Sequence, residues 1–204
     1  MARDTQSIVK MSRREGYALH PKAHKALVKR STPPGQQTRG FRSKPSQYSI
    51  QLREKQKVKR LYGLLEKQFR NLMKEAMKAE GQSGETLLKF LELRADNAVY
   101  RAGYAVSRRA ARQLVTHGHF DLNGHRIDIP SIRMKPGDVL SVRSKSKKTD
   151  YFKRIDDVSP ASSELPTWMN VDRKKLELSI TGVPTRDEAE PDIKEQLIVE
   201  YYSR

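Results

Sequence analysis

Three arginines stand close together near the middle of the chain and have the chemistry to bind phosphate. Arg108, Arg109 and Arg112 fall within little more than one turn of a predicted helix, so at least two of them share a face. A guanidinium group is planar and always charged, and its N–H donors match pairs of phosphate oxygens. The spacing therefore favours contact with a phosphate backbone, although a solvated helix face is the alternative.

Other kinds of chemistry lack support in the sequence. The serines have no paired His and Asp that would make a nucleophile, and no glycine-rich loop of the Walker or Rossmann type is present. The chain has no cysteine, which excludes a disulfide framework and a cysteine-based zinc site. His117 and His119 flank Gly118 without a third metal ligand. We expect no enzyme activity, no metal and no cofactor.

The net charge indicates the partner. The 204 residues include 41 Lys and Arg against 24 Asp and Glu, a formal charge of +17. Each Lys or Arg beside a phosphate releases condensed counterions, so nucleic acid is the leading partner. No apolar run approaches the ~20 residues of a membrane-spanning helix, and the first residues do not resemble a signal peptide. We expect a cytoplasmic protein that binds no membrane.

The arginines lie in a compact pattern between residues 92 and 152. Small apolar residues from Ala95 to Ala102 form one helical face, and Ser107 is predicted to cap the helix that carries the arginines. Short alternating runs on both sides of Asn123-Gly124 indicate a hairpin with a two-residue turn. The pattern predicts a helix-helix-β-hairpin module.

The flanking segments differ in character. Residues 1–46 are basic and broken by prolines, which predicts an extended arm with short helical pieces, ordered mainly by its partner. Residues 47–91 have helical spacing of apolar residues and predict a helical domain. Prolines divide residues 153–204 into short pieces, and the pattern at 197–201 fits a strand or a helix equally well.

Several motifs resemble a known family. The module resembles the S-four RNA-binding domain, and nearly the whole chain resembles the family of bacterial small-subunit ribosomal protein number four. The motifs that carry the resemblance are SRREG at 12–16, PPGQ at 33–36, QLREKQKVKRLYG at 51–63, EKQFRNL at 66–72, DNAVYRAGYAVSRRAARQLVTHGH at 96–119, LNG at 122–124, PGD at 136–138 and the ending EQLIVEYYSR.

The resemblance implies an α+β fold, in which the module is inserted into a mainly helical domain that carries the basic arm. The C-terminal segment, residues 153–204, would pack back on the helical domain from about residue 155 onward. The family is a structural component of the small ribosomal subunit that binds ribosomal RNA at a 5′-domain junction and nucleates assembly of the subunit body. The implied partners also include the neighbouring small-subunit protein number five, other ribosomal proteins and mRNA near its entry channel, with an effect on translational accuracy.

Some residues depart from the family pattern. Some members hold zinc in the arm through four cysteines, and Val9 and Ser12 stand where one cysteine pair would be. Gln37 and Thr38 also replace residues that are usual in the family. These departures concern details of the arm and agree with the expectation of no zinc.

The candidate RNA-binding residues are cations and polar side chains spread over the arm, the helical domain and the module. They are Arg13, Arg14, Arg39, Arg42 and Lys44; Arg53, Lys55, Lys57, Lys59, Arg60 and Arg70; and Arg94, Arg101, Ser107, Arg108, Arg109, Arg112, Gln113, His117, His119 and Asn123. The two histidines fit RNA contact and helix capping equally. Asp96 either aligns an arginine toward RNA or lies on a polar helix face.

Two other classes of protein carry a similar module. RNA-modifying enzymes and tyrosyl-tRNA synthetases use it to hold RNA, but residues 153–204 are too short and too rich in proline for a catalytic domain. A stress-type protein that acts on stalled ribosomes is the other alternative. The LREKQK motif at 52–57 and the YYSR ending argue against it.

Removal of metal ions is expected to leave the fold unchanged, because the chain has no cysteine to hold a structural metal. Thermal melting of the protein with and without a strong chelator measures this. A melting curve that shifts with the chelator would contradict the expectation.

Overall fold

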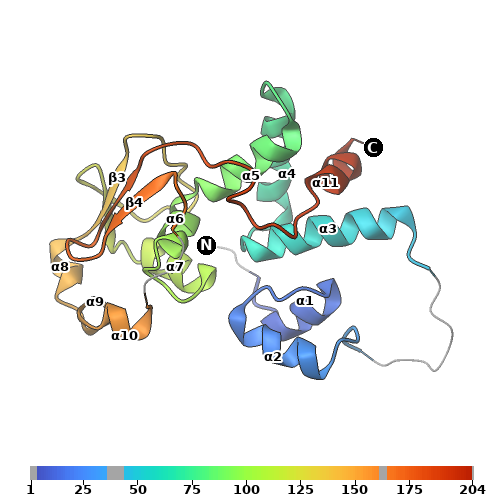
Figure 1. Ribbon diagram of the computed structural model, residues 1–204, viewed down its shortest axis with the longest axis horizontal. Coiled ribbons are helices and arrows are strands. Elements are labelled where there is room, and N and C mark those ends of the chain that lie inside the picture. The colour runs from blue at the N-terminus through green and yellow to red at the C-terminus, as the bar shows by residue number, and fades with distance from the viewer. Residues whose placement is uncertain (1–3, 36–43, 161–164, 204) are drawn as a thin grey trace. The chain divides into compact units, whose positions relative to one another are not determined.

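The computed structural model describes residues 4–35, 44–160 and 165–203. The chain forms two compact units. The first contains residues 1–87 and 192–204, and the second contains residues 88–191 (Figure 1).

The described part of the first unit is helical. Its helices are α1 (Ile8–Glu15), α2 (Pro21–Lys29), α3 (Gln47–Leu61), α4 (Glu66–Lys78) and α11 (Glu195–Tyr202), and α5 (Ser83–Glu92) begins in it and ends in the second unit. The helix α1 packs against α2 and α3, and α11 packs against α3. The turn between α3 and α4 contains Gly63, whose φ of 66° is unfavourable for residues other than glycine.

The arm has the expected helical pieces, but they also bury a small core of their own. Met11 of α1, Ala23 of α2 and Leu19 between the two helices are buried. Ser12 Oγ accepts a hydrogen bond from the backbone N–H of Leu19 at 3.3 Å. Packing within this hairpin therefore orders residues 8–29 to a greater extent than the charge pattern predicts.

The last segment of the chain is a helix rather than a strand. Ile198 of α11 is fully buried, and Gln51 of α3 donates a hydrogen bond to Glu200 at 2.7 Å. The ammonium group of Lys55 lies 4.6 Å from the ring centroid of Tyr201. These contacts with α3 decide between the two structures that the sequence pattern allowed.

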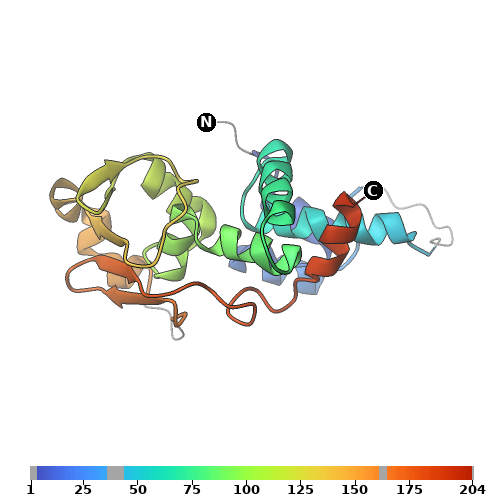
Figure 2. The ribbon, with the colours of Figure 1, turned by 90° about the horizontal axis from the view of Figure 1, so that it is seen from above.

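The second unit combines helices with an antiparallel sheet, which confirms the expected α+β class. Its helices are α6 (Ala95–Arg101), α7 (Arg108–Thr116) and the short α8 (Ser144–Lys147), α9 (Asp150–Lys153) and α10 (Ile155–Val158). Its strands are β1 (Phe120–Leu122), β2 (His125–Ile127), β3 (Val139–Val142), β4 (Met169–Asp172) and β5 (Glu177–Ile180), in the order β2-β1-β3-β5-β4. Figure 2 shows the helices and strands of this unit in a second view.

The predicted two-residue turn joins β1 and β2. Asn123 and Gly124 have φ of 50° and 82°, which suits a hairpin turn that matches the twist of its strands. Asn123 also fixes this hairpin to the next strand, because its side chain accepts a hydrogen bond from Val139 N at 2.8 Å and donates one to Asp138 at 2.9 Å. The turn therefore sets the register of the first three strands.

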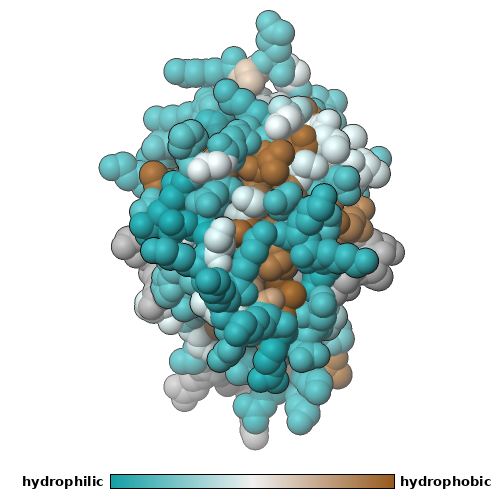
Figure 3. Space-filling view, turned by 90° about the vertical axis from the view of Figure 1, so that its left-hand side faces the viewer, coloured by the Kyte–Doolittle hydropathy of each residue, from teal (hydrophilic) through white to brown (hydrophobic). Residues whose placement is uncertain are grey.

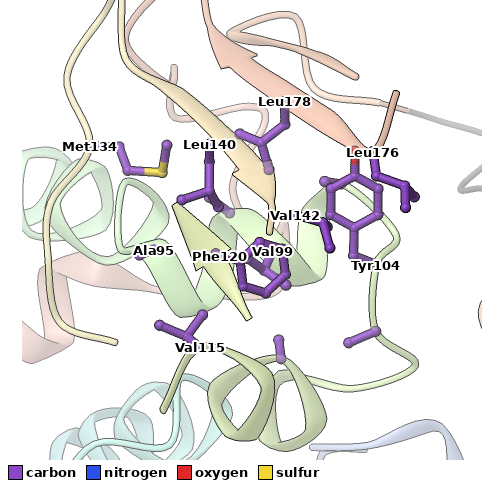
Figure 4. Close-up of a cluster of buried hydrophobic side chains, with 14 of the residues drawn as sticks. Ala95, Val99, Tyr104, Val115, Phe120, Met134, Leu140, Val142, Leu176 and Leu178 are labelled. Atoms are coloured by element: carbon purple, nitrogen blue, oxygen red, sulfur yellow. The ribbon is translucent and has the colours of Figure 1, made fainter. Parts of the chain in front are cut away.

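Both module helices pack on the sheet. Val99 of α6 and Val115 of α7 point toward Phe120 and Leu140, and all four side chains are fully buried (Figure 4). The hydroxyl of Tyr104 donates to the carbonyl oxygen of Glu177 on β5 at 3.0 Å. This core fixes the orientation of α7.

The C-terminal segment is divided between the units in a way that differs from the expectation. Residues 153–204 were expected to pack together on the helical domain, but β4 and β5 extend the module's sheet, and only residues 192–204 belong with α3. The physical reason is the edge of β3, whose Leu140 pairs with Leu178 of β5. A module of some 60 residues also has little core of its own, and these strands enlarge it.

Replacement of Phe120 by Ala is expected to destabilise the second unit by about 3–5 kcal/mol, because it leaves a cavity under β1. Denaturant unfolding, followed by the fluorescence of the buried Trp168, measures this. Ile129 to Ala is the control, since that side chain is 52% exposed and its loss costs little. Equal stability of the two variants would contradict the described core.

Candidate nucleic-acid interface

One face of α7 points to solvent. Arg109, Gln113, Thr116 and His117 are exposed, at the spacing of one helical stripe, while the residues of the opposite face are buried in the core. Ser107 begins the helix: its side chain accepts a hydrogen bond from Ala110 N at 3.2 Å, as expected of a cap. Its hydroxyl therefore has a structural partner within the unit.

Asp96 holds two arginines beside this face. Arg94 donates from Nε and Nη2 to the two carboxylate oxygens of Asp96 at 3.0 and 2.8 Å, and Arg112 Nη1 donates to Asp96 Oδ2 at 3.1 Å. The side chains of Arg94 and Asp96 are only 3% and 6% exposed. Asp96 thus pairs with arginines, and Arg94 is an internal residue whereas Arg112 reaches the surface.

Arg101 and Arg108 are held in a hydrogen-bonded ring with Glu92, Asn97 and Glu190. Glu92 accepts hydrogen bonds from Arg101 at 3.0 and 2.9 Å and from Asn97 at 2.7 Å. Arg108 donates to Asn97 Oδ1 at 2.9 Å and to Glu190 at 2.8 Å, and Glu190 lies 3.6 Å from Arg101. Because each guanidinium has two partners, its direction is fixed before any ligand arrives.

Two further cations gather at the carboxyl end of α7. A Cβ added to Gly118 would lie 2.6 Å from Arg126 Nε, so the guanidinium of Arg126 rests against this glycine. Arg143 donates to the Gly118 carbonyl oxygen at 3.4 Å and pairs with Asp121 at 3.2 Å. Carbonyl groups at a helix end attract cations, which extends the basic surface beyond the helix.

The two histidines have different surroundings. His117 is exposed, whereas His119 is half-buried, with Nδ1 3.0 Å from Ser146 Oγ and its ring against Phe152. Burial lowers the pKa of His119, and the charges of His117 and Arg143 lower it further. His119 is therefore a packed residue, and His117 is the one that faces solvent.

Arg126, Arg143 and Glu190 are not among the residues that the sequence indicated. Arg126 had a usable signal, because a two-residue turn at 123–124 places it opposite Asp121, in the register that the strands adopt. No local sequence pattern indicated Glu190, because its partner Arg108 lies 82 residues away in the sequence. Asn123, a predicted contact, is exposed but its side chain is held by the sheet.

Most candidate cations of α3 have partners within the first unit. Lys55 and Lys59 donate to Glu66 at 2.9 and 3.1 Å. Burial acts to raise the pKa of Glu66, but hydrogen bonds from Lys55, Tyr202 and Lys59 outweigh it and hold the pKa below its usual value. Lys57 donates to the Asp192 carbonyl oxygen at 2.7 Å.

Arg53 and Arg60 both pair with Glu15 of α1, whose side chain is fully buried. In the arm, Arg13 donates to the Thr32 carbonyl oxygen at 3.0 Å. Arg14, Lys44 and Arg70 are exposed. The predicted contacts Arg39 and Arg42 lie outside the described residues.

Within the described ranges, no three His, Asp or Glu side chains come together as a metal-binding group, and no helix has the length and apolar character to cross a membrane. What the surface around α7 offers is a set of cations in fixed positions. Such a surface is suited to a polyanionic partner.

Comparisons with known proteins agree with this reading. Residues 3–92 match the family model of the ribosomal protein S4/S9 N-terminal domain, and residues 93–140 match that of the S4 domain. The chain is 48% identical to the small ribosomal subunit protein uS4 of Pelodictyon phaeoclathratiforme, 48% identical to that of Clostridioides difficile and 47% identical to that of Chloroherpeton thalassium. Each match covers 100% of both chains.

These relatives are structural proteins of the small ribosomal subunit in the bacterial cytoplasm, and the family is not one of enzymes. Their identity lies far above chance over the full length, and the two family models meet where the first unit gives way to the module. The resemblance drawn from the motifs is confirmed: the chain belongs to the uS4 family of small ribosomal subunit proteins.

Proposed function

We propose that this protein binds small-subunit ribosomal RNA through the exposed face of α7 and thereby serves as a structural component of the subunit. The observation that carries the proposal is the arrangement of Arg109, Gln113 and His117 on one solvent-facing stripe, flanked by Arg108 and Arg112. The flanking guanidinium groups are held by carboxylates, so little side-chain entropy is lost when RNA binds.

The candidate residues divide into three groups under this proposal. Direct contacts come from Arg14, Lys44, Arg109, Arg112, Gln113 and His117 and from the cations at the end of α7, Arg126 and Arg143. Positioning falls to Asp96, Arg94, Ser107 and the ring around Glu92, which hold the surface in place. Lys55, Arg60 and their neighbours on α3 mainly tie the first unit together.

Affinity and specificity have different sources. Neutralised phosphates supply most of the affinity, which makes binding depend on salt. A cationic surface without base-reading pockets recognises RNA by the shape of its backbone, and a multi-helix junction offers such a shape. From the family resemblance we propose the 5′-domain junction as the target, with an early role in which the bound protein nucleates assembly of the subunit body.

The remaining partners follow from the family. We propose contacts with the neighbouring small-subunit protein number five and an effect on translational accuracy. We also propose mRNA contact near the entry channel through the basic arm, where Arg14 and Lys44 are exposed and Arg39 and Arg42 extend the charge. The arm's excess of cations supports this assignment.

Replacement of Arg109 by Ala is expected to weaken RNA binding and to lower the slope of log affinity against log salt by about 1, the share of one phosphate. Its exposed side chain has no part in the core, so the melting temperature should stay unchanged. A salt series with a 5′-domain RNA fragment measures the slope.

Lys67 to Ala, an exposed cation on α4, is the matched control for loss of one charge. The triple change of Arg108, Arg109 and Arg112 to Ala should reduce the slope further. Unaltered binding of the triple variant would reject the role of α7.

A further inference from the structure

Two lysine-bearing segments meet at the edge of the second unit. One is α8 with Lys148 after it, and the other is the turn between β4 and β5. The ammonium group of Lys147 donates to the carbonyl oxygen of Lys175 at 2.6 Å, although 28 residues separate the two. We call Lys145, Lys147, Lys148, Lys174 and Lys175 the α8 lysine patch.

The patch carries positive charge that the protein itself does not neutralise. Within the described ranges, Lys145, Lys148 and Lys174 form no ion pair, and all three are exposed. Lys175 approaches Asp172 at 3.8 Å, but both side chains are at least 45% exposed, and such a pair is weak in water. Figure 3 shows that hydrophilic side chains cover most of the face on which α8 lies.

The backbone beneath these lysines is fixed. Asp172 Oδ1 accepts hydrogen bonds from the N–H groups of Lys174 and Lys175, both at 3.0 Å, which closes the turn. Ser146 of α8 contacts His119 at 3.0 Å. Binding to this surface would order only the lysine side chains, and that lowers its entropic cost.

The residue types indicate the kind of partner. Lysine is a compact charge without the planar fork of arginine, which suits phosphate oxygens rather than base edges. Single strands are usually bound by stacking on exposed aromatic rings. The large exposed apolar residues of the second unit that the structure describes include no aromatic ring. A helical segment of RNA, read through its phosphates, fits best.

We propose that the α8 lysine patch is a second RNA-binding surface, which contacts the phosphate backbone of a helical RNA segment while α7 contacts another part of the same RNA. The inference rests on the proposed function. It assigns a role to residues that follow the two matched domains, which end at residues 92 and 140.

The test is a triple variant of the full chain, Lys145→Ala, Lys148→Ala and Lys174→Ala, measured on a 5′-domain fragment of small-subunit ribosomal RNA across a salt series. Each lost phosphate contact lowers the slope by about 0.9, so a fall of about 2–3 is expected, with weaker binding at every salt concentration. The melting temperature should not change. Arginine at the same three positions should restore the slope, because it also binds phosphate.

The matched control removes three exposed lysines of α4, by Lys67→Ala, Lys74→Ala and Lys78→Ala. These lysines also form no ion pair within the described ranges. A patch variant that binds like the unaltered protein would overturn the inference. An equal loss in the α4 variant would overturn it too, since net charge alone would then explain the effect.

Arg109→Ala in the same series separates this inference from the proposed function. If Arg109→Ala weakens binding and the patch variant does not, only the second surface is refuted. If neither variant alters binding, the proposed role of α7 fails as well.

Discussion

Asp96 and Glu92 are buried carboxylates, and the surface around α7 depends on them. Arg94, Arg101, Arg108 and Arg112 would repel one another if they stood together without counter-charges. Asp96 accepts hydrogen bonds from two of these arginines, and Glu92 binds a third in a bidentate pair. An ion pair out of water is costly to break, because it leaves a buried charge without a partner. The carboxylates therefore allow the arginines to lie close together and fix the direction of their guanidinium groups. A protein with side chains fixed in this way can bind phosphate with little reorganisation.

Residues near the C-terminus of the second unit also hold α7 in place. Glu190 completes the pairing of Arg108, and β5 supplies Leu178 to the core on which α7 rests. Two residues that follow the module in the sequence, Leu178 and Glu190, thus hold the arginine-bearing helix in place. An isolated module without β4, β5 and Glu190 would lose part of its core and one carboxylate. This explains why the second unit, as the structure forms it, continues well past the hairpin.

Local signals allowed much of this architecture to be predicted. Asn123-Gly124 fixes a turn that needs positive φ, and Ser107 begins a helix as a cap, so hairpin and helix both follow from neighbouring residues. The motifs also identified the family, which the comparisons confirm.

The features that could not be predicted from the sequence depend on contacts between residues far apart in the chain. The pairing of β3 with β5, the contact of Glu190 with Arg108 and the burial of Glu15 among arginines of α3 leave no local pattern. For the same reason the sequence predicts RNA contact for the lysines and arginines of α3 without indicating that Lys55 and Arg60 also have carboxylate partners inside the unit. Charge alone predicts that cations lie at a surface, and only the fold shows which of them are already paired.

The central claim is that a cationic surface with fixed geometry recognises the shape of one RNA. Its most direct test is binding of the full chain to a 5′-domain fragment of small-subunit ribosomal RNA, beside an unrelated structured RNA of equal length, across a salt series. The account predicts a preference for the ribosomal fragment that survives moderate salt. Equal affinities for the two RNAs, falling together as salt rises, would contradict it and leave only a generic attraction between a basic protein and a polyanion.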